Sequence, residues 1–169
     1  YVACKPNYYI APTNKDKHGK ELWNHHKMVK RTMFNYDGVE GGKTGYTTKA
    51  GGTLVTFAKR GDQELIAVDL CAHGYELYED TIKMLNYGFN NYKTIAPFKT
   101  MNTVLKDDTY GFLKTGNELS PYKIPLKHLN DVTVMLEKKQ SASKLTYKCK
   151  DNKYIISYDG KQIGSVKLH

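Results

Sequence analysis

The 169-residue sequence is poor in cysteine, in long apolar runs and in acidic side chains, and each scarcity argues against a class of protein. Its three cysteines, Cys4, Cys71 and Cys149, are far apart and odd in number. Neither a disulfide framework nor a Cys-x-x-Cys metal site is therefore indicated, and we expect buried thiols. No run approaches the roughly 18 apolar residues that a membrane-spanning helix needs. The 17 acids are outnumbered by 26 lysines and arginines, which gives a net charge of +9.

The residues that are abundant indicate a folded, basic protein. Hydrophobic residues make up 40% of the chain and 14 residues are tyrosines, a composition that suits a strand-rich domain better than a disordered one. The positive charge is uneven, because residues 1–96 contain 13 basic and 10 acidic residues whereas residues 97–169 contain 13 and 7. A basic surface suits nucleic acid, anionic membrane or anionic cell-wall polymer. No recognition motif supports nucleic acid, so that partner is not expected.

Periodicity predicts an α+β arrangement in the first half of the chain. Residues 53–58 and 65–70 are rich in β-branched and aliphatic side chains, and the segment 60–63 between them is typical of a turn, so we expect a β-hairpin. Residues 76–87 change to a helical period, with Leu77, Thr81, Met84 and Leu85 on one face. Gly88 follows where a C-terminal helix cap is expected.

Composition shifts near residue 97. We expect a domain boundary at about residue 96, followed by a small all-β sandwich or barrel over residues 97–169. Its expected strands are residues 132–136, 145–149, 154–158 and 162–168, with a two-residue turn, Asp159-Gly160, between the last two.

Two kinds of site are candidates for the run from Gly41 to Thr47, of sequence Gly-Gly-Lys-Thr-Gly-Tyr-Thr. A phosphate-binding loop needs a glycine five residues before Gly42, but Asp37 occupies that position. Such a loop also opens a helix, whereas this run leads into a β-branched segment. The nucleotide interpretation therefore fails, and no cofactor or metal is expected. The adjacent histidines, His25 and His26, point to different sides of any regular element, so we expect structural or surface roles for them.

As an edge strand, the same run has a plausible chemistry for peptide binding. Alternation places Lys43, Gly45 and Thr47 on one side and Thr44 and Tyr46 on the other. An edge strand offers backbone groups to which an extended peptide can add. Lys43 would supply positive charge beside a nucleophile, a backbone N–H near Tyr46 would stabilise an oxyanion, and threonine hydroxyls would contact a carboxylate. Lys-Thr-Gly alone is a weak signal, because Lys114-Thr115-Gly116 repeats it in a segment that we expect to be a loop.

A longer pattern extends from Asp37 to Thr47 and continues with Ala50-Gly51, the predicted hairpin and the sequence Leu-Asn-Tyr-Gly-Phe at residues 85–89. This pattern resembles the C-terminal half of D-alanyl-D-alanine carboxypeptidases, the low-molecular-weight penicillin-binding proteins. The segment 24–28 is similar to the Asn-rich entry to that motif, and residues from 97 onward resemble the family's second, β-rich domain. The resemblance implies a serine peptidase that acts on the D-Ala-D-Ala end of peptidoglycan stem peptides through an acyl-enzyme, with β-lactams as inhibitors. It makes Lys43 catalytic and Thr44, Gly45, Tyr46 and Thr47 substrate-binding.

The chain departs from the family pattern in several places. The family's Ser-x-x-Lys and Ser-x-Asn motifs precede Lys-Thr-Gly, but none of the 42 residues before Lys43 is a serine, and Ser-x-Asn occurs nowhere. Two later segments, 120–123 and 141–144, match Ser-x-x-Lys by letter, and we interpret both as accidental. Leu77 stands where the family commonly has an arginine that reads the substrate carboxylate, so either another cation, such as Lys49 or Arg60, substitutes for it or substrate binding is weakened. Tyr46 stands where many members have histidine.

Taken together, residues 1–96 are predicted to be the C-terminal part of a transpeptidase-like catalytic domain and 97–169 a second domain. The nucleophile would lie on a preceding segment outside these residues, or on a separate chain. The resemblance implies an extracytoplasmic bacterial location. A partial domain would leave an apolar sheet face uncovered. The alternative is a non-catalytic module derived from this family, which docks on cell-wall polymer or on a partner protein.

Overall fold

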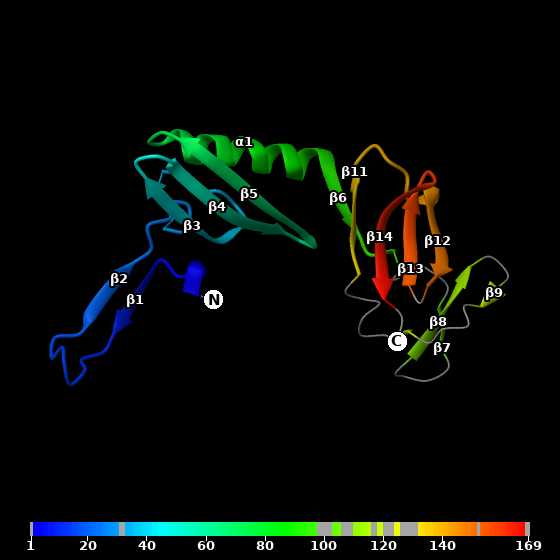
Figure 1. Ribbon diagram of the computed structural model, residues 1–169, viewed down its shortest axis with the longest axis horizontal. Helices are drawn as coiled ribbons and strands as arrows, with labels where there is room; N and C mark the ends of the chain where they lie inside the picture. The colour runs from blue at the N-terminus through cyan, green and yellow to red at the C-terminus, as the bar shows by residue number, and fades with distance from the viewer. Residues whose placement is uncertain are drawn as a thin grey trace. The chain divides into compact units, whose positions relative to one another are not determined.

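The computed structural model describes residues 2–30, 33–97, 103–105, 110–115, 118–119, 124–125, 132–151 and 153–167. The chain divides into two compact units, Tyr1–Asn90 and Asn91–His169 (Figure 1). Composition placed the boundary at about residue 96, whereas the structure divides the chain a few residues earlier. The reason is that strand β6 (Tyr92–Ile95) pairs with strand β11 (Val134–Glu137) of the second unit. Every strand pair among the described residues is antiparallel.

The first unit is built on a sheet of order β3-β4-β5, formed by β3 (Val39–Thr47), β4 (Gly51–Arg60) and β5 (Gln63–Ala72). Along β4 buried and more exposed side chains alternate: Leu54, Thr56 and Ala58 are fully buried, whereas Val55 is 41% exposed. Gly61 has φ +58° in the turn between β4 and β5, a conformation that glycine adopts without a Cβ penalty. The predicted hairpin is confirmed.

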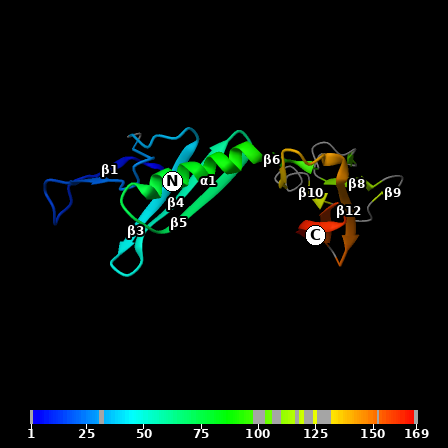
Figure 2. The same ribbon diagram turned by 90° about the horizontal axis from the view of Figure 1, so that it is seen from above.

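Helix α1 (Glu76–Asn91) covers one face of this sheet (Figures 1 and 2). Its acids Glu76 and Glu79 lie in the first turn, where their negative charges interact favourably with the positive end of the helix dipole. The buried residues that the helix, the sheet and the preceding loop contribute to one core are Met28, Phe34, Leu54, Ala58, Ala67, Leu77, Tyr78, Leu85 and Phe89.

Two details predicted for this helix were wrong. Met84 is 39% exposed, because the buried stripe runs through Tyr78, Leu85 and Phe89 instead. Gly88 does not cap the helix, which continues to Asn91. A Cβ on Gly88 would lie 2.5 Å from Cδ1 of Leu65 on β5, so the glycine allows the helix to approach the sheet closely.

A two-stranded hairpin precedes the sheet in the chain. It consists of β1 (Asn7–Ile10) and β2 (Lys20–Trp23), and Tyr8, Tyr9 and Trp23 are each more than half exposed on it. The short 3-10 helix η1 (Val2–Cys4) lies against the start of β3, since a Cβ on Gly41 would be 3.1 Å from Sγ of Cys4.

The second unit is rich in β-structure. Strands β12 (Leu145–Lys150), β13 (Lys153–Tyr158) and β14 (Lys161–Lys167) form a three-stranded sheet, preceded by the 3-10 helix η3 (Ala142–Lys144). The buried residues Val134, Tyr154 and Ile156 join it to the β6–β11 pair as two packed layers. A further sheet contains β7 (Thr103–Leu105), β8 (Tyr110–Thr115), β9 (Glu118–Leu119) and β10 (Ile124–Pro125).

The turn predicted at Asp159-Gly160 is confirmed, with φ of +50° and +80°. The expectation of buried cysteines was wrong for Cys4 and Cys71, which are exposed free thiols. Cys71 has φ +63° beside the register shift between Gly52 and Thr53, so its side chain leaves the core at the end of β5. The side chain of Cys149 lies outside the described residues.

Candidate functional site

Strand β3 forms one edge of its sheet and carries the Lys-Thr-Gly motif. Lys43 lies opposite Val55 of β4, and Val55 lies opposite Val68 of β5, so these three side chains share the sheet face that α1 does not cover. The Lys43 side chain is exposed, and its Nζ donates a hydrogen bond of 2.6 Å to the backbone oxygen of Thr44. The motif therefore presents a cation at the border of an open sheet face.

The residues that follow Lys43 end the strand. Thr44 lies opposite the buried Leu54, and Tyr46 lies opposite Gly52 with 76% of its surface exposed. The Oγ1 of Thr47 accepts a hydrogen bond of 3.1 Å from the backbone N–H of Ala50 and so closes the turn into β4. The structure thus brings the five predicted site residues onto one edge strand.

A buried pair of polar side chains, His26 and Thr56, packs against the helix-facing side of β3, and the sequence analysis did not predict it. His26 and Thr56 are both fully buried, with 2.9 Å between Nε2 and Oγ1. A Cβ on Gly42 would lie 2.5 Å from Nε2 of His26, so the imidazole lies against the backbone immediately before Lys43. Burial lowers the pKa of His26, which keeps the ring neutral at pH 7. The signal in the sequence was the second glycine of Gly41-Gly42, which leaves space for a ring.

Asn24 fixes the loop that brings His26 into this position. Its Nδ2 donates to the backbone oxygens of Ala3 and Lys5, at 3.2 and 3.0 Å, and its Oδ1 accepts from the backbone N–H of His26 at 2.9 Å. One amide side chain therefore ties η1, the approach to β1 and the histidine together. This arrangement explains structurally why an Asn-containing segment precedes the motif.

The sheet face that carries Lys43 exposes a cluster of aliphatic side chains, which we call the open face. Its members Val55, Ile66, Val68 and Leu70 are 41%, 69%, 50% and 68% exposed. The cross-strand pairs Val55–Val68 and Thr53–Leu70 place them side by side. The expected uncovered apolar face is confirmed, and an apolar surface of this kind marks a site of contact with another segment or protein.

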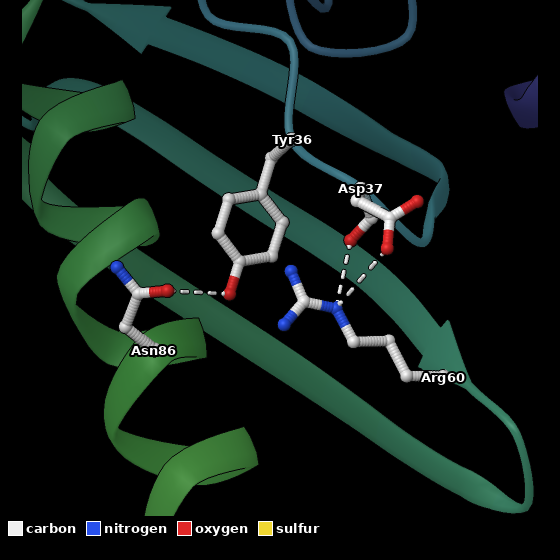
Figure 3. A network of polar contacts seen from close by, with 4 residues as sticks. All are labelled: Tyr36, Asp37, Arg60 and Asn86. Atoms are coloured by element: carbon white, nitrogen blue, oxygen red, sulfur yellow. Dashed lines mark hydrogen bonds and ion pairs between the residues drawn. The ribbon is translucent and has the colours of Figure 1, made fainter.

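Arg60, one of the two cations suggested to replace the family arginine, belongs to a network at the other end of β4 (Figure 3). Its Nε lies 3.1 Å from the backbone oxygen of Asp37 and 3.7 Å from Oδ2 of Asp37. Its guanidinium lies over the rings of Tyr36 and Phe89, at 4.6 and 4.5 Å from their centroids. Tyr36 in turn donates to Oδ1 of Asn86 on α1 at 2.8 Å. Arg60 therefore fixes the entry to β3 and does not face Lys43.

Leu77 lies in the core, only 9% exposed, and a Cβ on Gly52 would lie 2.8 Å from its Cδ1. It adds no positive charge near β3. Lys49 is exposed in the turn between β3 and β4, beside the end of the strand that carries Tyr46 and Thr47. Of the two suggested cations, Lys49 is the one that the fold places near the motif.

The second Ser-x-x-Lys match has a structural role. Ser141 is the N-cap of η3, where its Oγ accepts from the backbone N–H of Ser143 at 3.3 Å. Lys144 pairs with Oδ2 of Asp159 at 3.3 Å. The first match, residues 120–123, lies outside the described residues. The repeated Lys114-Thr115 pairs with Glu118 and Leu119 across β8 and β9, so a hairpin is present where we expected a loop.

Comparisons with known proteins agree on one family. The family described as D-alanyl-D-alanine carboxypeptidase matches residues 6–74. The D-alanyl-D-alanine carboxypeptidase DacF of Bacillus subtilis is 30% identical over 154 residues, which cover 88% of this chain and 37% of that protein. DacC of Escherichia coli, also a D-alanyl-D-alanine carboxypeptidase, is 35% identical over 77 residues, or 45% of this chain and 18% of that protein. The chain thus spans less than half the length of these relatives.

Solved structures show the same fold. Penicillin binding protein 5 from Haemophilus influenzae matches 99% of this chain and 48% of its own, with a TM-score of 0.58 and 22% identity. PBP3, a peptidoglycan synthesis regulatory factor from Streptococcus pneumoniae, matches 99% of this chain and 49% of its own, with a TM-score of 0.56 and 14% identity. The antiparallel sheet with its packed helix is therefore part of a transpeptidase-type domain, followed by a β-rich unit. The family model and both curated relatives thus support a member of the D-alanyl-D-alanine carboxypeptidase family, matched over the part of the chain that carries the Lys-Thr-Gly strand.

Proposed function

We propose that this chain is the substrate-aligning portion of a serine-type D-Ala-D-Ala carboxypeptidase that trims peptidoglycan stem peptides. The observation that carries the proposal is the position of Lys-Thr-Gly on a free sheet edge, with Lys43 at the border of the open face. An extended stem peptide would add to β3 by backbone pairing. The proposal assigns Lys43 a catalytic role and Thr44, Gly45, Tyr46 and Thr47 a substrate-binding role.

Each proposed role follows from what the side chain or backbone presents. Lys43 would stabilise negative charge as an acyl-enzyme forms and would favour an activated serine nearby. Its present hydrogen bond to the Thr44 oxygen involves an exposed side chain, so rotation of the ammonium toward a substrate costs little. Lys49 would attract the terminal carboxylate of the substrate in place of the family arginine, since Leu77 is apolar and buried.

The nucleophile would come from a segment that precedes these residues in the polypeptide, or from a separate chain. None of the residues before Lys43 is a serine, and Ser141 is occupied as a helix cap. The open face supports the proposal that the nucleophile comes from another segment, because a serine-bearing segment that covered this face would lie beside Lys43. Such a protein would act outside the cytoplasm of a bacterium, with stem peptides as substrates and β-lactams as covalent inhibitors.

The proposal is tested with the polypeptide encoded by the gene together with its upstream sequence. We expect an in-frame Ser-x-x-Lys followed by Ser-x-Asn upstream, and labelling of the full polypeptide by a fluorescent penicillin. Lys43→Ala should slow acylation by about 100-fold or more, as loss of one preorganised electrostatic group does. Lys17→Ala, in the exposed β1–β2 connection, is the matched control and should not change it.

The 169 residues alone should remain unlabelled. Labelling of this shorter chain, or acylation of the full polypeptide that does not depend on Lys43, would refute the assignment.

The alternative is a non-catalytic module derived from the same family. The observation that favours it is Leu77, which is packed into the core and leaves the family's carboxylate-reading position without a charge. A start codon or signal peptide directly before Tyr1 would support this alternative over the enzyme. In that case β3 and the open face would serve as docking surfaces.

A further inference from the structure

Four lysines gather on one face of the three-stranded sheet of the second unit. Lys150 lies directly opposite Lys153, and Lys153 lies directly opposite Lys167, so three lysines form a line across β12, β13 and β14. Lys148 lies opposite Ile155, two positions along on the same face. All four side chains are exposed, and we call them the lysine face.

The packing of the sheet does not require this arrangement. The opposite face carries Tyr154 and Ile156, each 1% exposed, and supplies the core. Like charges that face each other across adjacent strands oppose sheet formation, and adjacent strands lie only about 4.8 Å apart. The repulsion within this line of three lysines therefore disfavours the sheet locally, and the packing of the core does not account for it.

Among the described residues no ion pair joins an acid to the lysine face, and the acid nearest to it in the chain is the exposed Asp151, in the turn between Lys150 and Lys153. The uncharged side chains that share it are Thr146, Ser157, Gln162 and Ser165, together with Ile155. Within residues 132–151 and 153–167, the ion pairs that the structure contains join Lys139 to Glu137 and Lys144 to Asp159. The face thus presents four positive charges that a partner with matching negative charges can neutralise.

We propose that the lysine face binds a linear cell-wall polymer whose negative charge is carried by phosphodiester groups. All 13 basic residues of segment 97–169 are lysines. Lysine binds a phosphate as a point charge, whereas arginine is favoured where a carboxylate or phosphate is held bidentately in a fixed orientation. An exposed face with several such charges suits a flexible chain of repeated phosphates that is held without fixed orientation.

The other polyanions fit the lysine face less well. Nucleic-acid bases stack on aromatic side chains, but Tyr147, Tyr154 and Tyr158 lie on the opposite face of this sheet. Peripheral membrane binding needs apolar side chains that insert between headgroups, typically tryptophan, phenylalanine or leucine. The described apolar residues on or bordering the lysine face are Ile155 and Ile163, with no aromatic side chain beside them. The proposal goes beyond the carboxypeptidase role and does not require acylation.

The test measures binding of the complete 169-residue chain to soluble poly(glycerol phosphate), with anionic phosphatidylglycerol vesicles and single-stranded DNA as the other two probes. The variant Lys150→Gln/Lys153→Gln/Lys167→Gln removes the line of charges. Lys15→Gln/Lys17→Gln/Lys20→Gln removes the same net charge from exposed positions of the first unit. Neither variant touches Lys43 or Lys49.

We expect the first variant to weaken binding to poly(glycerol phosphate) by about tenfold or more at low salt and to flatten its salt dependence, because fewer counterions are exchanged. The control should weaken it by less than about threefold. The midpoint of thermal unfolding should not fall in the first variant, since it relieves repulsion between lysines. Equal losses in the two variants, no measurable binding, or equal or tighter binding to vesicles or DNA would each overturn the proposal.

Discussion

Substitution of Gly42 by alanine tests whether the buried His26–Thr56 pair fixes the position of β3. A Cβ at residue 42 would overlap the backbone oxygen of Val55 and would lie 2.5 and 2.6 Å from Nε2 and Cδ2 of His26. The oxygen belongs to the paired strand β4 and the imidazole is fully buried, so neither can move aside cheaply. The strand must therefore shift away from β4 or displace the histidine.

The magnitude follows from what such a shift breaks. Loss of about two β3–β4 hydrogen bonds costs ~1–3 kcal/mol, and a buried Thr56 hydroxyl left without His26 adds ~1–3 kcal/mol. We therefore expect Gly42→Ala to lower the free energy of unfolding of the first unit by about 2–6 kcal/mol. For a unit of this size the midpoint of thermal unfolding should fall by about 10 °C or more.

Unfolding followed by hydrogen exchange of the β4 amides measures the first unit separately from the second. The matched control is Gly164→Ala on β14, where a Cβ would lie 4.0 Å from Cδ1 of Ile156 and needs no positive φ. It should cost less than about 1 kcal/mol. If Gly42→Ala is as mild as this control, the contact between His26 and β3 does not constrain the strand and the reasoning fails.

Two further predictions concern the same unit. Leu85→Ala, at a site 1% exposed, should lower the free energy of unfolding by about 2–5 kcal/mol, whereas Met84→Ala, at 39% exposure, should cost less than about 1 kcal/mol, as chemical denaturation would show. Equal costs would contradict the helix orientation. Burial lowers the pKa of His26 below 6.5, so the unfolded chain takes up this proton first as the pH falls, and stability should decline below about pH 6.5. Melting of wild type and His26→Asn at pH 7.5 and 5.5 should show a smaller decline in the variant, and an equal decline would assign the effect to other groups.

Local pattern was enough to predict several elements, because their signals lie within a few residues. The β-branched and aliphatic composition of residues 53–58 and 65–70 and the turn over residues 60–63 predicted β4 and β5 correctly. Asp159-Gly160 predicted the turn between β13 and β14, since positive φ is a local demand of a two-residue hairpin. The helix of residues 76–87 was also predicted, but its end was not, because Gly88 serves contact with Leu65, which is distant in sequence.

The candidate site divides in the same way. The Lys-Thr-Gly strand, the alternation of Lys43 and Thr44 and the lack of a serine among residues 1–42 could all be read from the sequence, because motif, period and composition are local properties. The edge position of the strand and an uncovered apolar face were expected from the sequence, but the identity of the residues on that face, the position of His26 against Gly42 and the position of Arg60 at the far end of β4 became visible in the folded unit. The lysine face is likewise a result of register, which aligns residues from three strands. Such relations depend on which strands pair and on which face the core forms, and these are set by packing across the whole unit.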